Sequence, residues 1–443
     1  NIKDFVTRPN ALSCGAGPGA AAENNDRIGH AATRVIVKMD WDLLDDVHSR
    51  VTLVKGSYVV SASPRVYGAA AQNVNQLQDS SFIQEANVKI DKVFGLLDVT
   101  AGRQFYGEEG DLIVYYGPRD NYGMLVSAID MFRADWNGEH MSVTGIAGKT
   151  SDTFVEDTGL AQTDLRGLVV SCKMHEMVKP SLYVYNRVTH ATGGLGSTLP
   201  NRSGVANGKN TNLWVAGVKA KLATGGLTAS LEFAKNFGED RTTYAGLVNG
   251  AQSTNYKGYA VQLKAGYKLD LSDVGSLNPW GEFGMGTGDS NFEANGNNTF
   301  QSINTDYRPG GIYGRFDTGA AIALANNSVA NGGNTFASNG LSNRVIWGLG
   351  FKATPSAVNK LTVGAAFYRY AMHRVAPNAG GLKSSRNLGS EIDVTGEWKH
   401  SENVSFKATA GTFKPGAAVT DLKGANAAIN PAVMLSGDVA IRF

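Results

Sequence analysis

Hydrophobic and polar residues alternate at a period of two along most of the chain, and the pattern is clearest over residues 433–443. One face of this stretch carries Val433, Leu435, Val439, Ile441 and Phe443, and the other carries Met434, Ser436, Asp438, Ala440 and Arg442. Successive side chains of a strand point to opposite faces, so the pattern predicts a β-strand with one apolar and one mostly polar face. The apolar face fits the core of a soluble sandwich or the lipid-facing side of a membrane barrel.

Similar stretches recur and predict about 18 strands. The predicted segments are residues 2–8, 33–41, 50–61, 82–92, a strand ending near 104, 124–136, 140–149, 163–173, 181–188, 214–222, 227–233, 259–269, 279–287, 344–352, 361–370, 391–398, 404–408 and 433–443. Most have about the length that a tilted strand needs to cross the hydrocarbon of a bilayer.

Short and long connections alternate between these segments. This order is typical of outer-membrane barrels, with short periplasmic turns and long extracellular loops. We therefore predict an all-β fold: one antiparallel transmembrane β-barrel spanning residues 1–443, with about 18 strands and 16 as the alternative. The longest loop, 288–341, is a candidate lid or plug. A solenoid would need a fixed repeat, and the sequence shows none; paired soluble sandwiches are the other competing architecture.

Composition narrows this picture without deciding it. Glycine is abundant (54 residues), proline is scarce (12), and 18% of residues are charged. The mean hydropathy of -0.19 suggests a soluble protein, but half of each barrel strand faces the lumen and conceals the membrane signal. No run of about 18 apolar residues predicts a membrane helix. The net charge of +2 is too small to indicate nucleic acid. The first residue, Asn1, suggests a processed exported chain or a trimmed one.

No arrangement of residues predicts catalysis or a cofactor. The seven histidines are scattered, no Cys-x-x-Cys-His haem motif occurs, and Cys14 and Cys172 lie far apart without a pairing pattern. Asp289, Asn291 and Glu293 place oxygen ligands at alternate positions, as calcium loops do, but the glycine and the distal glutamate of such loops are missing. We therefore predict no enzyme activity, no cofactor and no metal, with these three residues as a calcium candidate only.

Several short motifs resemble the alginate-export family of bacterial outer-membrane porins. They are Glu85-Ala86-Asn87-Val88, Ala101-Gly102-Arg103-Gln104, Gly286-Thr287-Gly288-Asp289, Gly389-Ser390-Glu391-Ile392-Asp393 and Gly411-Thr412-Phe413-Lys414-Pro415-Gly416. The resemblance implies a monomeric barrel of about 18 strands in the outer membrane. It also implies insertion by the assembly machinery that recognises the terminal strand, here Val439, Ile441 and Phe443. Alginate itself does not follow, because acidic residues accompany the basic ones.

Charged residues on the polar faces are the candidate pore lining. The basic candidates are Arg34, Lys38, Lys89, Arg103, Arg166, Lys219, Lys221, Lys264, Lys268, Arg344, Lys352 and Lys407. The acidic candidates are Asp40, Glu85, Glu282, Glu391, Asp393, Glu397 and Asp438. Arg103 breaks the alternation of its strand, so a bulge near Gly102 would have to turn it inward. Charged lumen side chains tune the selectivity of such pores.

These features predict a porin for passive diffusion of small hydrophilic solutes, with a mild preference for anions. The alternative is a scaffold barrel that anchors the envelope or sheathes a partner protein. The expected partners are outer-membrane lipid, the solutes, the assembly machinery and, for the alternative, accessory envelope proteins.

Overall fold

The computed structural model describes residues 2–7, 28–61, 82–120, 124, 126–151, 163–189, 211–240, 254–288, 296–314, 340–375, 385–418 and 430–443. Within these ranges nearly all regular structure is β-strand, joined by one 3-10 turn, η4 (Ser356–Val358).

The strands run in one sheet. In chain order they are β1 (Ile2–Thr7), β2 (Ile28–Leu44), β3 (Val47–Ser61), β4 (Phe82–Val93), β5 (Leu97–Gln104), β6 (Ile129–Asn137), β7 (Met141–Ser151), β8 (Thr163–Cys172), β9 (Val178–Thr189), β10 (Thr211–Thr224), β11 (Leu227–Asp240), β12 (Thr254–Tyr256), β13 (Tyr259–Tyr267), β14 (Leu269–Asp270), β15 (Gly275–Gly286), β16 (Gly296–Asn297), β17 (Arg344–Pro355), β18 (Leu361–Met372), β19 (Asn387–Lys399), β20 (Val404–Pro415) and β21 (Ala432–Ile441).

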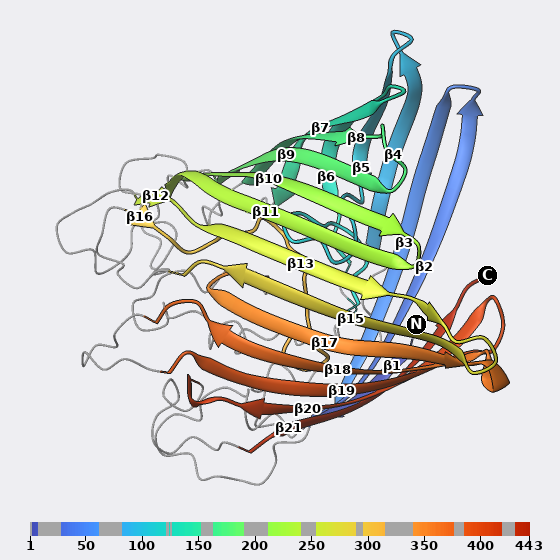
Figure 1. Ribbon diagram of the computed structural model, residues 1–443. Coiled ribbons are helices and arrows are strands. Elements are labelled where there is room, and N and C mark those ends of the chain that lie inside the picture. Colours follow the sequence, from blue (N-terminus) through green and yellow to red (C-terminus); the bar gives the residue numbers. More distant parts are fainter. Residues whose placement is uncertain are drawn as a thin grey trace.

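Each long strand pairs antiparallel with the next one along the chain, as Figure 1 shows. β1 lies between β21 and β2 and pairs with both, so the ladder is continuous around the barrel. Three of the 21 strands in the described part, β12, β14 and β16, are pieces of two or three residues; the other 18 make the ring. The predicted all-β antiparallel barrel is confirmed, and its first strand is the short N-terminal segment that the sequence predicted over residues 2–8.

The outer and inner faces of the sheet differ in polarity. Large apolar side chains project outward from the strands, and Phe132, Leu349 and Leu435 are each more than 60% exposed. On the opposite face of the same strands, Glu391 and Arg344 are almost completely buried. This is the reverse of a soluble β protein, in which the apolar face is hidden, and it is the polarity expected of a barrel that faces lipid.

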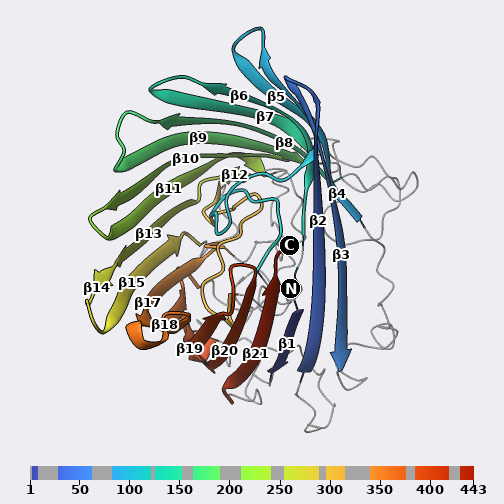
Figure 2. The same cartoon turned by 90° about the vertical axis from the view of Figure 1, so that its right-hand side faces the viewer.

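Two connections fold into the barrel instead of staying outside it. They are residues 105–120, between β5 and β6, which we call the first inner segment, and residues 298–314, between β15 and β17, the second inner segment (Figure 2). Leu112, Ile113, Phe300 and Tyr307 of these segments are buried and belong to one apolar cluster with inward residues of the strands. The sequence did not predict that the first of these connections turns inward.

Candidate functional site

The two inner segments contact each other inside the barrel. Val114 and Asn304 form a parallel bridge, and the Tyr115 N–H donates to the Asn304 carbonyl at 2.8 Å. The Arg119 guanidinium donates to the Thr305 carbonyl at 2.8 Å and lies 3.7 Å from the Asp306 carboxylate. These contacts make the inner segments one unit that crosses the lumen.

Carboxylates of β19 hold the second inner segment against the wall. The backbone N–H groups of Ile312 and Tyr313 donate to the two carboxylate oxygens of Glu391, at 2.6 and 2.9 Å. The Gly311 N–H donates to Asp393 at 2.8 Å. These hydrogen bonds are shielded from water because Glu391 is fully buried, so breaking one would leave a buried polar group without its partner. We refer to Glu391 and Asp393 as the acidic latch.

The first inner segment places carboxylates next to the basic strand β10. The Glu108 carboxylate lies 2.5 Å from Lys221 Nζ and 3.3 Å from Lys219 Nζ, and Asp111 lies 3.6 Å from Lys219. Burial raises the pKa of the Glu108 carboxyl, but the two lysines outweigh it and hold the pKa below its usual range. Glu108 is therefore ionised at neutral pH. One unit of the positive charge of Lys219 and Lys221, which the sequence predicted to line the pore, is thus neutralised.

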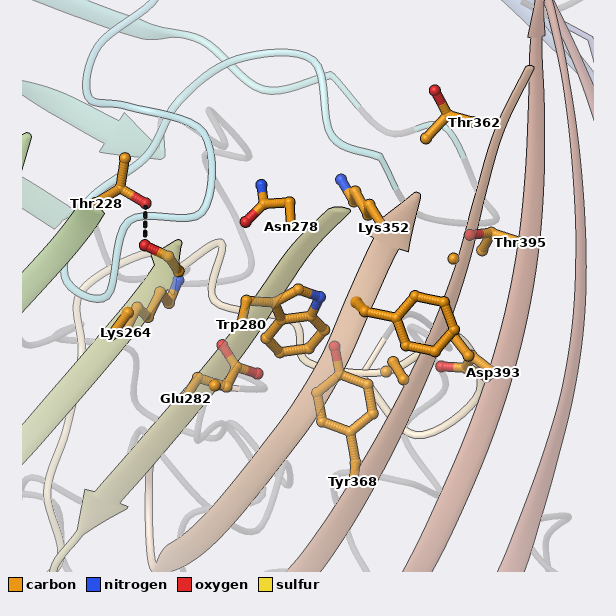
Figure 3. A pocket seen from close by; sticks show the side chains of 18 of the residues that line it. Thr228, Lys264, Asn278, Trp280, Glu282, Lys352, Thr362, Tyr368, Asp393 and Thr395 are labelled. Carbon is orange, nitrogen blue, oxygen red and sulfur yellow. Dashed lines mark hydrogen bonds between the residues drawn. The ribbon is translucent and has the colours of Figure 1, made fainter. Parts of the chain in front are cut away.

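Two cavities lie beside the inner segments. One, of about 790 Å³, is bounded by Arg308, Gly310 and Gly311 of the second inner segment and by inward residues of β10–β21; the other, of about 780 Å³, adjoins Glu108 and Asp111. Figure 3 shows the first cavity, with Lys264, Glu282, Lys352 and Asp393 on its wall. Its charged lining residues are the bases Lys221, Lys264, Arg308, Lys352 and Lys407 and the acids Glu282, Asp393, Glu397 and Asp438. The two signs are nearly balanced.

The structure places most of the predicted lining residues on the inner face. The basic ones there are Arg34, Lys38, Lys89, Lys219, Lys221, Lys264, Arg344, Lys352 and Lys407, and the acidic ones are Asp40, Glu85, Glu282, Glu391, Asp393, Glu397 and Asp438. Many are already paired: the Asp40 carboxylate accepts from Arg50 at 2.6 Å, and Glu85 accepts from Thr52 at 2.6 Å. Lys268 lies just after β13 at the short-turn end, 3.3 Å from Asp270.

Two predicted lining residues face the other way. Arg103 is opposite Ala86, on the face that Val88 and Ile90 expose, and the pairing passes through Gly102 without a register shift, so the expected bulge is missing. Its guanidinium pairs with Asp130 at 2.8 Å.

Arg166 shares the outer face of β8 with Leu168, which is 45% exposed. The inner face of β8 carries the fully buried Leu165, so apolar residues occupy both faces and the alternation of the sequence cannot identify the inner one. Arg103 and Arg166 are therefore not lumen residues.

The remaining predictions concern metals and thiols. The calcium candidate Asp289, Asn291 and Glu293 lies outside the described residues, as does Cys14. Within the described part, no cluster of three or more potential metal ligands occurs, and Cys172 is a free thiol. Among the same residues, no helix has the length and apolar character needed to cross a bilayer.

An apolar outer face, a charged inner face and inward-folded connections together define an outer-membrane β-barrel fold. Comparison with solved structures gives the same fold. Over 99% of its length the chain matches 96% of Pseudomonas aeruginosa OccK9 (OpdG), with a TM-score of 0.54 and 11% identity. Over 100% of its length it matches 97% of P. aeruginosa OccK5 (OpdH), with a TM-score of 0.53 and 11% identity.

A third neighbour, P. aeruginosa OccK10 (OpdN), gives a TM-score of 0.51 at 10% identity, over 100% of this chain and 98% of that one. These neighbours are outer-membrane porins. At such low identity the likeness establishes the fold that the chain shares with them. No family model matches the sequence, and no curated protein sequence matches it.

Proposed function

We propose that this protein is an outer-membrane channel for passive diffusion of small hydrophilic solutes. The observation that carries the proposal is the inverted polarity of the barrel, with apolar side chains outside and charged cavities inside. An 18-stranded ring is wide enough for a water-filled path, and the two inner segments narrow it. The near balance of charge around the larger cavity, with one more base than acid, favours only a mild preference for anions.

Within this class we infer three finer points. The motifs support a relationship to the alginate-export family, and the exposed side chains of Ile441 and Phe443 on the last strand support recognition by the barrel-assembly machinery. Contacts of the second inner segment with the acidic latch support a plug-like role for the described part of the 288–341 connection.

The test is reconstitution of the purified barrel into a planar lipid bilayer under a tenfold gradient of KCl. We expect stepwise conductance and a reversal potential of the sign that indicates weak anion preference. Absence of conductance would reject the channel, and strong cation selectivity would reject the assigned role of the basic wall. A mock preparation from cells lacking the protein controls for contaminating porins.

A further inference from the structure

Trp280 and Tyr368 form an aromatic platform on the wall of the larger cavity. Their ring centroids are 5.9 Å apart and their planes are tilted by 45°. Both residues line the cavity, and Figure 3 shows the Trp280 ring between Glu282 and Lys352, with the Tyr368 ring beside it. They come from β15 and β18, which are separated by β17, so the platform is assembled from strands far apart in the sequence.

Two glycines of β17 make room for these rings. Gly350 pairs with Trp280, and Gly348 pairs with Tyr368. A Cβ atom at Gly350 would lie 2.6 Å from the indole, and one at Gly348 would lie 2.8 Å from the Tyr368 ring. The rings therefore occupy the space above the two glycines, so that the backbone supports them on the wall side and the cavity borders them on the other.

The next inward aromatic residue of β18 shows what a packing role looks like in this barrel. Tyr370 is fully buried, and its ring stacks on that of Tyr313, from the second inner segment, with centroids 4.1 Å apart. Tyr368, two residues earlier, is only partly buried and lines the cavity. Tyr368 also packs against this buried cluster, with its ring centroid 6.1 Å from that of Tyr370, so the second inner segment covers Tyr370 and leaves part of the Tyr368 ring on the cavity wall.

The polar surroundings of the platform contain both charges and neutral groups. Lys264 and Glu282 are opposite each other on neighbouring strands, and Asn278 and Lys352 form the next inward row beside Trp280. Aromatic faces bind ligands through flat, weakly polar surfaces, while a few polar groups fix the orientation. Because positive and negative groups nearly balance here, the site suits a neutral ligand with a flat C–H face and a hydroxyl-bearing edge.

We propose that the Trp280–Tyr368 platform is a binding subsite for pyranose sugars, whose ring face would stack on the aromatic side chains while its hydroxyl groups bond to Glu282, Lys352 and Asn278. This assignment rests on the proposed channel function and names a class of solute for it. A subsite of this kind would slow the passage of a sugar and make its entry visible as interruption of the ion current.

The experiment measures maltotriose in two ways. Isothermal titration calorimetry on the detergent-solubilised barrel reports binding without requiring conduction, and block of the ion current in the planar bilayer reports binding within the pore. We expect Trp280→Ala and Tyr368→Ala to weaken both by roughly threefold to tenfold, the range that aromatic contacts support. Trp280→Phe should retain most of the binding.

Two matched controls separate the site from general effects on the barrel. Trp214→Ala removes a tryptophan that stacks on Phe237 of the outer face, and it should leave sugar binding unchanged. Gly348→Ala, whose added Cβ would meet only the side chains of Glu282 and Tyr368, should displace the Tyr368 ring and weaken binding, whereas Gly437→Ala, where an added Cβ meets nothing within 4 Å, should not.

The outcomes distinguish this inference from the channel proposal. Conductance without any effect of maltotriose overturns the sugar subsite and leaves the channel standing. Calorimetric binding that Trp280→Ala weakens, in a barrel that does not conduct, supports the subsite and rejects the channel. If benzoate binds in a manner that depends on Trp280 and maltotriose does not, the platform serves aromatic acids and the proposal is wrong.

Discussion

Glu108 neutralises part of the positive charge that Lys219 and Lys221 present to the lumen. Its carboxylate contacts both Lys219 and Lys221, at 3.3 and 2.5 Å. Replacing it by glutamine keeps the shape of the side chain and removes one negative charge. The two lysines then present an additional uncompensated unit of positive charge to the cavities that they line.

The size of the effect follows from Coulomb's law in a water-filled space. An unbalanced charge about 6 Å from a monovalent ion contributes roughly 0.7 kcal/mol at the dielectric constant of water, which is about a threefold change in local concentration. Anions gain this factor and cations lose it. The ratio of anion to cation permeability should therefore rise by roughly threefold to tenfold in Glu108→Gln.

The assay is the reversal potential across a planar bilayer under a KCl gradient, at a mean concentration near 0.1 M and again near 1 M. The Debye length falls from about 10 to about 3 Å between these conditions, so the effect should largely vanish at high salt. Asp130→Asn is the matched control, because this carboxylate pairs with Arg103 on the outer face. An unchanged ratio in Glu108→Gln at low salt, or an equal change in the control, would refute the reasoning.

Three further predictions address pH, the acidic latch and the outer face. The lysine partners of Glu108 lower its pKa, so the carboxylate stays charged until the pH falls through that lowered pKa. The difference in ion selectivity between wild type and Glu108→Gln should therefore persist at neutral pH and disappear in acid. A difference that is independent of pH would contradict this. Replacing Glu391 by Gln together with Asp393 by Asn removes carboxylate oxygens that accept three backbone hydrogen bonds, each worth about 0.5–1.5 kcal/mol. Single-channel recordings should then show a larger and noisier conductance. Glu397→Gln, at a residue that lines the same cavity, should leave the conductance unchanged. Leu349→Arg puts a charge on the lipid-facing side, which should lower the folding stability by about 2–4 kcal/mol near mid-membrane. Urea titration of barrel folding into lipid vesicles should show this loss of stability. An unchanged urea midpoint would argue against membrane contact at this position.

The faces of most strands could be predicted because their alternation is strong. In β21, the outward side chains Val433, Leu435 and Ile441 are the exposed ones, as the sequence predicted. The sequence also predicted the N-terminal segment, residues 2–8, as a strand, and β1 occupies Ile2–Thr7. The alternation is a local property of the chain, because a strand of a membrane barrel directs its polar side chains to the lumen and its apolar side chains to the lipid.

Alternation failed where the inner segments fill the lumen. Once residues 105–120 turn inward, the facing wall must itself be apolar, and Leu165 takes the inner face of β8 while Arg166 takes the outer one. The pattern of such a strand has apolar residues on both sides, and no local rule separates them. For Arg103, the simple alternation gave the correct outward face, and the added bulge gave the wrong one.

The sequence by itself determined the class of fold, the strand order and the lipid-facing set, because these depend on period-two polarity and on the lengths of connections. Only the tertiary structure decided which charges remain available, because Glu108 reaches Lys221 across 113 positions of sequence. It also decided where a ligand can stack, since Trp280 and Tyr368 meet only when Gly348 and Gly350 of the strand between them leave room. Contacts of this kind depend on register and on inward-folding loops, which no local pattern encodes.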